Sequence, residues 1–339
     1  FEGDLGAGGP VGLRPTGPVA TVEKSIGGTD TWYNVDEIAA ETGGLGITFG
    51  WGYHHVVVDP TVPGFLDLSF GQGYSSIDIV EEGNIRISVQ SWNGVEIDAE
   101  DRTVHEREGY SGLGVAGYVR QWQGSDADDI MLGSSRGEIF ITRTGNDRVD
   151  GRGGHDVVRY DRSGLTWLNV SFTGIGAALV TGLWFGQSFA DELQNIEEVR
   201  GSRTGATAFH GSEGEDWLVA RGGATWLEGN GGDDRLFAGS GRDIFVFGPG
   251  SGQDQVQGFA IGSDLIDLSA FGILDISQAQ QFSFIDNTTT IAFATGESIA
   301  IIGVDLTGVA QDEVFIFNRI EGVEGDNKAD GVGALIGTS

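Results

Sequence analysis

The chain has 339 residues, of which 39% are hydrophobic, so it is long enough to bury a core and to form more than one domain. Aspartate and glutamate total 50 against 19 lysines and arginines, and the formal net charge of -31 should repel nucleic acid and anionic lipid. The absence of cysteine excludes disulfides and thiolate metal sites, which leaves bound hard cations as the obvious means of offsetting the charge.

The ends of the chain carry no signal that places the protein in a membrane. No apolar run approaches the roughly 18 residues that a membrane helix needs, and no secretory leader is visible. The chain starts at Phe1, and its only methionine is Met131. We therefore expect a processed or truncated product without a membrane span, and an earlier segment outside this sequence.

Residues 1–120 show no repeat. The opening "FEGDLGAGGPVGLRPTGP" is rich in glycine and proline and is typical of a loop or linker. Alternating segments such as "FLDLSF" and "NIRISVQSW", bounded by turn residues, predict an all-β domain with antiparallel strands. One short helix is predicted over residues 34–43, where Asn34 can cap the start and Gly43 can end it.

A nine-residue repeat begins at Gly124. It runs without a gap to Arg159 in the units "GSDADDIML", "GSSRGEIFI", "TRTGNDRVD" and "GRGGHDVVR". After a break over residues 161–200, where we expect a β-rich insertion and a short polar helix or turn, it resumes from Gly211 to Val246 as "GSEGEDWLV", "ARGGATWLE", "GNGGDDRLF" and "AGSGRDIFV". Two looser echoes, "SGQDQVQGF" and "IGSDLIDLSAFG", follow.

Two positions of the repeat are chemically distinctive. The sixth position, including its counterparts in the echoes, carries the acids Asp129, Glu138, Asp147, Asp156, Asp216, Asp234, Asp243, Asp254 and Asp264. The eighth position carries the large apolar residues Met131, Phe140, Val149, Val158, Leu218, Leu227, Leu236 and Phe245. Periodic placement of apolar residues indicates a folded repeat, because a disordered tract has no reason to keep them in register.

The residue types of the repeat suit calcium. Glycine lets the first part of each unit bend so that backbone carbonyls turn toward one point, and the aspartate adds a hard anionic oxygen there. Calcium accepts six to eight such oxygens in flexible geometry, whereas magnesium demands a tighter octahedron. The last three residues predict a short strand whose middle side chain points inward, so that stacked units bury an apolar ladder between two sheets.

This pattern resembles the RTX family of calcium-binding β-roll proteins, whose repeat is written GGxGxDxUx with U a large apolar residue. The resemblance covers about residues 124–320. It implies that the acid at position six of each turn helps to bind a calcium ion shared with the turn two units along. Glu138 is one methylene longer than aspartate, and Thr225 and Ala206 offer no carboxylate, so their sites should be weak or empty. About six ions would reduce the charge from -31 to about -19.

The strands of the repeat are unusually apolar on both sides. Positions seven and nine should face outward, yet they include Ile130, Leu132, Ile139, Ile141, Trp217, Val219, Trp226, Phe237, Ile244 and Val246. We expect these faces to be covered, either within the chain or by self-association, a cell surface or an extracellular matrix partner.

The C-terminal region also resembles RTX proteins. Such proteins carry an uncleaved signal for type I secretion, in which acidic residues precede apolar ones, as in "DEVFIF" from Asp312. The resemblance therefore implies secretion by a Gram-negative bacterium and folding in external calcium. The predicted fold is all-β: a β-rich domain over 1–120, a parallel β-roll over 121–160, an insertion over 161–200, a second roll block with a β cap over 201–320, and a polar tail over 321–339.

No catalytic signature is complete. A zinc protease needs HExxH, but only "HEREG" occurs at His105, and "GYSGL" at Gly109 misses GxSxG by one position. His54 and His55, followed by Asp59, point to opposite faces of a strand and make a poor metal site. The acidic pairs Glu81 with Glu82 and Glu96 with Asp98 are typical of a solvated strand edge.

Three functions remain open from the sequence. The first is a secreted, calcium-loaded structural protein without catalysis, acting at a cell surface or in an extracellular assembly. The second is an exported protease, lipase or polysaccharide lyase whose catalytic part lies in residues 1–120 or upstream. The third is a glycan-binding adhesin that uses aromatic residues such as Trp32, Trp51, Tyr53 and Trp92.

Overall fold

The structure is a computed structural model that describes residues 94–107 and 112–317 and, before them, a series of strands. These strands are β1 (Val19–Glu23), β2 (Thr29–Tyr33), β3 (Ala39–Ala40), β4 (Leu45–Phe49), β5 (His54–Val58), β6 (Phe65–Phe70), β7 (Tyr74–Ile79) and β8 (Asn84–Val89). The chain divides into two compact units, residues 1–157 and 158–339, which are described separately. The fold is all-β, as predicted, and its single described α-helix, α1 (Gln311–Val314), is far too short to cross a membrane.

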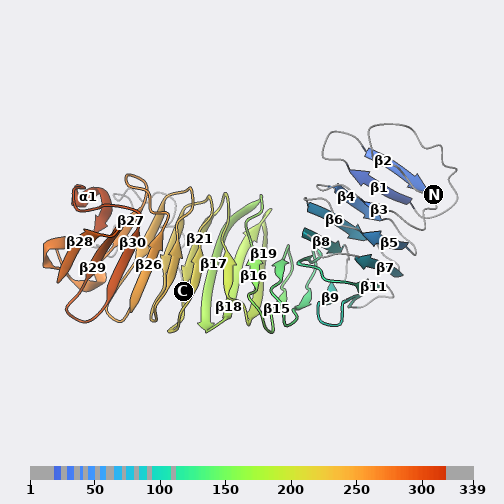
Figure 1. Cartoon of the computed structure of the whole chain (residues 1–339), viewed down its shortest axis with the longest axis horizontal. Coiled ribbons are helices and arrows are strands. Elements are labelled where there is room, and N and C mark those ends of the chain that lie inside the picture. Colours follow the sequence, from blue (N-terminus) through green and yellow to red (C-terminus); the bar gives the residue numbers. More distant parts are fainter. Residues whose placement is uncertain are drawn as a thin grey trace. The chain divides into compact units, whose positions relative to one another are not determined.

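Unit 1 is built from two β-sheets. Its further strands are β9 (Val95–Asp98), β10 (Thr103–Glu106), β11 (Gly112–Ala116), β12 (Gln121–Gln123), β13 (Ile130–Leu132), β14 (Ile139–Ile141) and β15 (Arg148–Asp150). Sheet A of this unit has the order β2-β1-β4-β6-β8-β12-β14, and sheet B has the order β3-β5-β7-β11-β10-β9-β13-β15 (Figure 1). Successive strands from β3 to β8 and from β12 to β15 alternate between the sheets, so the chain coils.

The antiparallel prediction for residues 1–120 is wrong over much of its length. Strand β6 pairs in parallel with both β4 and β8, and β7 pairs in parallel with β5. Antiparallel pairing is confined to β1 with its neighbours and to β9, β10 and β11. An alternating pattern reports which face of a strand is buried but not the direction of its partner. The predicted helix over 34–43 is also wrong at Ala39 and Ala40, which pair with β5.

Unit 2 repeats the same arrangement with longer strands at both ends. Its strands are β16 (Val157–Arg159), β17 (Leu165–Gly174), β18 (Ala177–Trp184), β19 (Gln187–Gln194), β20 (Glu198–Arg200), β21 (Ala206–His210), β22 (Trp217–Val219), β23 (Thr225–Glu228), β24 (Arg235–Phe237), β25 (Asp243–Val246), β26 (Gln253–Gln257), β27 (Leu265–Asp267), β28 (Gln281–Ile285), β29 (Thr288–Ala292), β30 (Ser298–Ile302) and β31 (Phe315–Ile316). Sheet A has the order β16-β20-β22-β24-β26-β30-β29-β28, and sheet B the order β19-β18-β17-β21-β23-β25-β27-β31 (Figure 1).

The segment between the two repeat blocks is an antiparallel meander. Strand β18 pairs antiparallel with β17 and β19, and β17 pairs in parallel with β21, so the meander extends sheet B. Of the short polar helix or turn predicted near its end, the described residues there contain no helix: the chain turns over residues 195–197 before β20, and the residues "QSFADELQ" form strand β19. Their alternation places Phe189, Asp191 and Leu193 in the interior, and this period-two pattern outweighs helix propensity.

The predicted inward ladder is confirmed. All eight apolar residues at position eight, from Met131 to Phe245, are at most 1% exposed, and Val256 and Ile266 in the looser echoes are fully buried. Aligned strands place these side chains directly above one another, as in the register of Leu218 with Leu236 and of Leu227 with Phe245. Burial of an aliphatic or aromatic side chain of this kind stabilises a fold by about 1.5–3 kcal/mol.

The outward positions are covered to different degrees. Ile139, Ile141, Trp226 and Ile244 are buried, and the other six apolar residues at positions seven and nine are half-buried. In sheet B of unit 2, Ala208, Trp226 and Ile244 form one apolar cluster.

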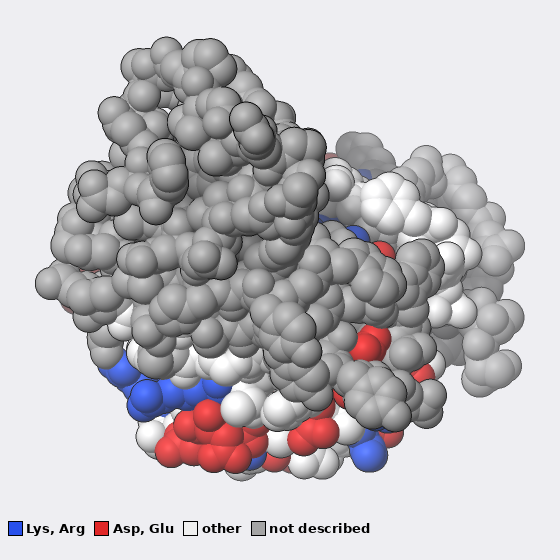
Figure 2. Space-filling model, turned by 90° about the vertical axis from the view of Figure 1, so that its right-hand side faces the viewer, with Lys and Arg blue, Asp and Glu red and all other residues white. Residues whose placement is uncertain are grey.

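Charged side chains are exposed at the turn between β9 and β10, which carries Glu100, Asp101 and Arg102. Figure 2 shows acidic side chains beside basic ones on the described surface.

Candidate calcium-binding turns

Two kinds of turn join the sheets. A-to-B turns lead from sheet A to sheet B, and they comprise residues 124–129 and 142–147 in unit 1 and 160–164, 201–205, 220–224, 238–242 and 258–264 in unit 2. B-to-A turns lead back, and they include residues 133–138 and 151–156 in unit 1 and 211–216, 229–234 and 247–252 in unit 2. Because sheets alternate, turns of one kind stack on each other two repeat units apart.

Glycine is required where stacked turns touch. Gly232, at position four, has a φ of +107°, and a Cβ there would overlap the carbonyl group of Gly214 in the preceding turn. Gly229, at position one, has no room for a Cβ because the Asp234 carboxylate folds back onto it. The missing side chains thus leave backbone carbonyl and carboxylate oxygens close together, which is the environment that the sequence predicts for calcium.

The position-six acids form a hydrogen-bonded ladder along each stack of turns. In each pair, the backbone N–H of one acid donates to a carboxylate oxygen of the acid in the next turn of the same kind, 18 to 21 residues later. The pairs are Asp129 to Asp147 at 2.8 Å, Glu138 to Asp156 at 2.7 Å, Asp216 to Asp234 at 2.9 Å, Asp234 to Asp254 at 3.0 Å and Asp243 to Asp264 at 3.0 Å. All nine predicted acids are buried.

Several of these acids keep one buried oxygen without a hydrogen-bond donor, among them Asp234, Asp243 and Asp254. Oδ2 of Asp234, Oδ2 of Asp254 and Oδ1 of Asp243 are buried and accept no hydrogen bond. A buried carboxylate oxygen of this kind is costly unless a cation or proton satisfies it. The arrangement therefore fits a hard cation held between turns, with Asp234 at the end of one B-to-A turn, Asp254 just after the next B-to-A turn and Asp243 just after an A-to-B turn.

Other acids of the ladder are satisfied by the chain itself. Ser125 donates through its backbone N–H and its hydroxyl to Asp129, and Ser212 donates through both groups to Asp216. Ser134 contacts Glu138 in the same way, so the longer side chain at this position is accommodated. These serines are not among the predicted site residues, although serine at position two of the units "GSDADDIML", "GSSRGEIFI" and "GSEGEDWLV" is a signal for these contacts.

Burial controls the protonation of the ladder. It raises the pKa of Asp234 to about 8 and that of Asp254 to about 7, and the negative charge of the neighbouring Asp254 adds to the rise at Asp234. Burial also raises the pKa of Asp129 and of Asp243 to about 6. The pKa values of Glu138, Asp216 and Asp264 are raised for the same reason. Without a bound cation, the ladder therefore holds protons near neutral pH.

The donor set suits calcium better than a transition metal. Within the described residues, no three His, Asp or Glu side chains converge as a metal cluster. Each pair of stacked turns offers two carboxylates and, beside them, backbone carbonyls. A mixture of carboxylate and carbonyl oxygens is typical of calcium, whereas zinc prefers imidazole and thiolate ligands.

The other catalytic and metal-binding candidates lie only partly within the described residues. His105 lies on strand β10 rather than on a helix. Asp98 is held by Arg152 through two hydrogen bonds of 3.0 and 2.9 Å, which outweigh the effect of burial and lower its pKa. The side chains of His54 and His55 lie outside the described residues, as do Asp59, Glu81 and Glu82. The side chain of Trp32 and the residues Trp51, Tyr53 and Trp92 also lie outside them.

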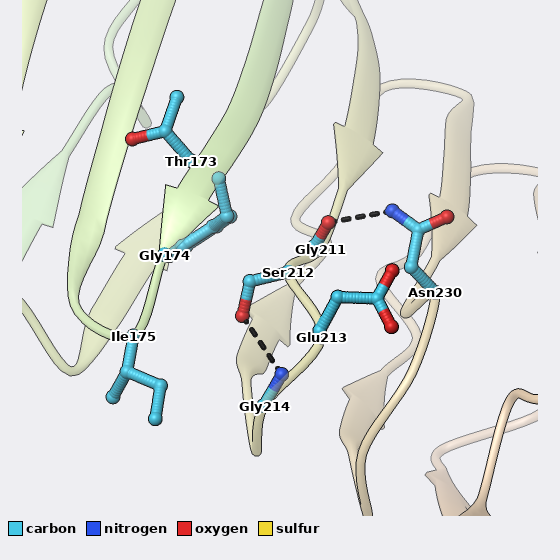
Figure 3. Close-up of a pocket in the computed structure, with 9 residues that line it drawn as sticks. Thr173, Gly174, Ile175, Gly211, Ser212, Glu213, Gly214 and Asn230 are labelled. Carbon is cyan, nitrogen blue, oxygen red and sulfur yellow. Dashed lines mark hydrogen bonds between the residues drawn. The ribbon is translucent and has the colours of Figure 1, made fainter.

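One surface pocket adjoins the B-to-A turns of unit 2. It has a volume of about 430 Å³ and lies between the tip of the β17–β18 hairpin, at Ile175, and the turns at Gly211–Gly214 and Asn230 (Figure 3). Asn230 donates to the Gly211 carbonyl at 2.5 Å, and the Ser212 hydroxyl accepts from the Gly214 N–H at 3.1 Å, so these groups serve the turns. Glu213 is the one titratable residue among those that line it, which gives no catalytic pair.

The "DEVFIF" segment is part of the folded unit. Its first residues fall in α1 and its apolar residues in β31, which pairs in parallel with β27. Val314 and Phe315 are buried. A role in secretion would thus belong to the chain before it folds.

Comparisons with known proteins agree with this geometry. The family described as "Peptidase M10 serralysin C terminal" matches residues 124–329, more than half of the chain. Among solved structures, the extracellular lipase LipA from Serratia marcescens has 17% sequence identity and a TM-score of 0.26, with 70% of this chain and 45% of the lipase chain covered, so the match spans less than half of the lipase. No curated protein matches the sequence. With its stacked turns and inward ladder, the chain belongs to the serralysin C-terminal family, the calcium-binding RTX β-roll region of secreted proteins.

Proposed function

We propose that this chain is a secreted β-roll that folds on binding calcium outside a Gram-negative cell and then serves as a structural part of a cell-surface or extracellular assembly. The observation that carries the proposal is the set of buried carboxylate oxygens without donors at Asp234, Asp243 and Asp254. Calcium would occupy these positions and replace the protons that burial otherwise favours. The nine ladder acids would supply its carboxylate ligands to differing extents.

The fit of calcium to the charge of the chain supports the same proposal. The 50 acidic residues outnumber the 19 basic ones, and the resulting net charge of -31 makes the chain repel itself. Inside the cell, where free calcium is scarce, the ladder would lack its cations and the chain would stay extended for export. Millimolar calcium outside would then drive folding.

Sedimentation of the full chain tests this proposal. We expect an expanded, slowly sedimenting species in excess chelator and a compact one in millimolar calcium, with magnesium at the same concentration giving little compaction. Regular calcium-dependent growth into larger species would support assembly. A chain that is equally compact in chelator and in calcium, with no ion bound by equilibrium dialysis, would overturn calcium-driven folding.

An attached or internal enzyme is the second candidate, because the matching family is named for the C-terminal part of a peptidase. The described strands from Leu45 to Gln123 join the two sheets of unit 1 and pair largely in parallel, which supports a structural rather than a catalytic role for this stretch. Incubation of the calcium-loaded chain with casein, a triglyceride and a polysaccharide would decide. Turnover of any of them would favour the enzyme.

A further inference from the structure

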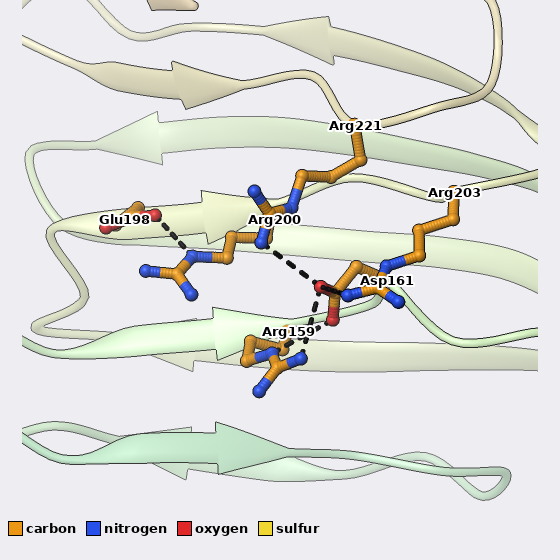
Figure 4. Close-up of polar contacts among 6 residues, drawn as sticks. All are labelled: Arg159, Asp161, Glu198, Arg200, Arg203 and Arg221. Atoms are coloured by element: carbon orange, nitrogen blue, oxygen red, sulfur yellow. Dashed lines mark hydrogen bonds and ion pairs between the residues drawn. The ribbon is translucent and has the colours of Figure 1, made fainter. Parts of the chain in front are cut away.

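Three A-to-B turns of unit 2, at residues 160–164, 201–205 and 220–224, lack a ladder acid and are joined by arginines instead. Position six is Leu165 after turn 160–164, Ala206 after turn 201–205 and Thr225 after turn 220–224. None of these residues supplies a carboxylate. Turns 201–205 and 220–224 instead carry Arg203 and Arg221, and both reach the same residue, Asp161 of turn 160–164 (Figure 4).

Asp161 is the centre of this arginine cluster, defined as Arg159, Arg203 and Arg221 around one carboxylate. Its side chain has no exposed surface. Arg159 donates through Nε to Oδ1 at 2.9 Å, while Arg203 and Arg221 each donate one terminal nitrogen to Oδ2, at 3.3 and 3.2 Å. Burial alone would raise the pKa of Asp161, but the three arginines outweigh it and hold the pKa below its ordinary value.

The charges of the cluster do not balance. Three guanidinium groups surround one carboxylate, which leaves a formal excess of about two positive charges. Arg200 lies beside the cluster, but it is paired with Glu198 at 2.5 Å and adds nothing to the excess positive charge (Figure 4). A local positive excess is unusual in a chain with a net charge of -31, and the missing position-six acids leave no carboxylate of the ladder to neutralise it.

Two of the arginines also have unused donors. Within the described part of the chain, Asp161 is the sole hydrogen-bond partner of the side chains of Arg203 and Arg221, although a guanidinium carries five N–H donors. Nε of Arg221 is buried without an acceptor. The side chain of Arg203 is 61% exposed, so a ligand can reach the cluster from solvent.

We propose that Arg203 and Arg221 form a binding site for a tetrahedral oxyanion, a sulfate or phosphate group, beside Asp161. Two guanidinium forks suit such an anion because each can donate a pair of parallel hydrogen bonds to it, and the anion would match the excess charge. Asp161 would act as a positioning residue that holds the two arginines together. The site is separate from the ladder acids and does not depend on the proposed function of the chain.

Isothermal titration calorimetry tests the site with inorganic sulfate, since phosphate precipitates with calcium. The calcium-saturated chain is titrated with sodium sulfate against sodium chloride of equal ionic strength. We expect sulfate binding to the unaltered chain and a loss of affinity of about tenfold or more in Arg203→Gln and in Arg221→Gln. Arg143→Gln is the matched control, because Arg143 lies on an A-to-B turn of unit 1 but is paired with Asp126 at 2.7 Å; it should bind sulfate normally.

A second arm identifies the source of the anion. Dextran sulfate is compared with neutral dextran for binding to the same variants. Binding of dextran sulfate that is lost in Arg203→Gln assigns the site to sulfate groups carried on a polysaccharide, whereas binding of inorganic sulfate alone assigns it to the free ion. No binding of either probe, or equal binding by the unaltered chain and both glutamine variants, would overturn the proposal.

Discussion

Two sets of turns in unit 2 connect the same two sheets but are held together by different chemistry. The B-to-A turns stack through Asp216, Asp234 and Asp254, and two of these acids keep a buried oxygen without a donor. The A-to-B turns 160–164, 201–205 and 220–224 stack through the arginine cluster around Asp161. The same bent backbone can therefore be held by a ladder of acids suited to a cation or by ion pairs, and we propose that the charges at the turns decide whether a stack requires a metal.

The largest effect is expected from breaking the metal-dependent stack. Asp234→Asn combined with Asp254→Asn removes both orphaned carboxylates of the B-to-A turns and should abolish calcium-induced compaction of unit 2, or cost at least about 3 kcal/mol of stability at saturating calcium. Circular dichroism during a calcium titration measures this calcium-induced folding. The control is Glu213→Gln, because Glu213 is exposed on a B-to-A turn of the same unit; it should change the free energy of unfolding by no more than about 0.5 kcal/mol. Equal calcium curves for all variants would contradict the ladder.

The arginine-held stack should fail in a different way. Asp161→Asn leaves three guanidinium groups without their central charge and should cost about 3–5 kcal/mol. The number of bound calcium ions, counted by equilibrium dialysis, should stay the same as long as the variant is folded. Asp286→Asn, a change on an exposed turn, serves as the control and should be nearly neutral. A smaller number of bound calcium ions in Asp161→Asn would show that the arginine-held turns also contribute to calcium binding.

The two stacks should also respond oppositely to pH. The pKa values of Asp234 and Asp254 rise to about 8 and about 7 in the folded, calcium-free chain, so this state binds more protons than the unfolded chain. Their contribution is present at low pH and is lost as the pH rises through this range. In chelator, the chain should therefore be more compact at pH 5.5, where protons occupy these carboxylates, than at pH 8.5, as measured by sedimentation velocity.

The contribution of Asp161 has the opposite sign. Its pKa is below the ordinary value, so its stabilisation persists at neutral pH and is lost only when the pH falls below about 4. Saturating calcium should remove the destabilisation at high pH, because the ion displaces protons from the ladder. A chain in chelator that is more compact at pH 8.5 than at pH 5.5 would contradict the assigned direction.

The smallest effect is expected from adding an acid at position six of one unit that lacks it. Thr225→Asp restores an acid at position six, 18 residues before Asp243, whose Oδ1 lacks a donor. We expect one additional calcium ion and a gain of about 1 kcal/mol at millimolar calcium, with a loss in chelator because two carboxylates would then repel each other. Thr225→Asn is the matched control and should add no ion. An unchanged ion count for Thr225→Asp would show that an acid alone does not make a site.

Much of the fold could be predicted from local pattern alone. Every predicted inward residue of the nine-residue repeat is buried, because strand alternation is a property of a few consecutive residues. The same reasoning failed for residues 45–89, where strands form but pair largely in parallel. It also allowed a short helix near strand β19, where Phe189 and Leu193 instead alternate toward the core and a turn follows.

The sequence by itself determined the repeat, the inward ladder and the need for cations, since period, side-chain size and charge are read along the chain. The tertiary structure alone decided which acids meet, because their partners lie 18 to 21 residues away and depend on how strands alternate between sheets. It also decided that serines satisfy Asp129 and Asp216, while Asp234 and Asp254 retain an oxygen for a cation. The convergence of Arg159, Arg203 and Arg221 on Asp161 is likewise a long-range result, because residues up to 60 positions apart meet only when the turns stack.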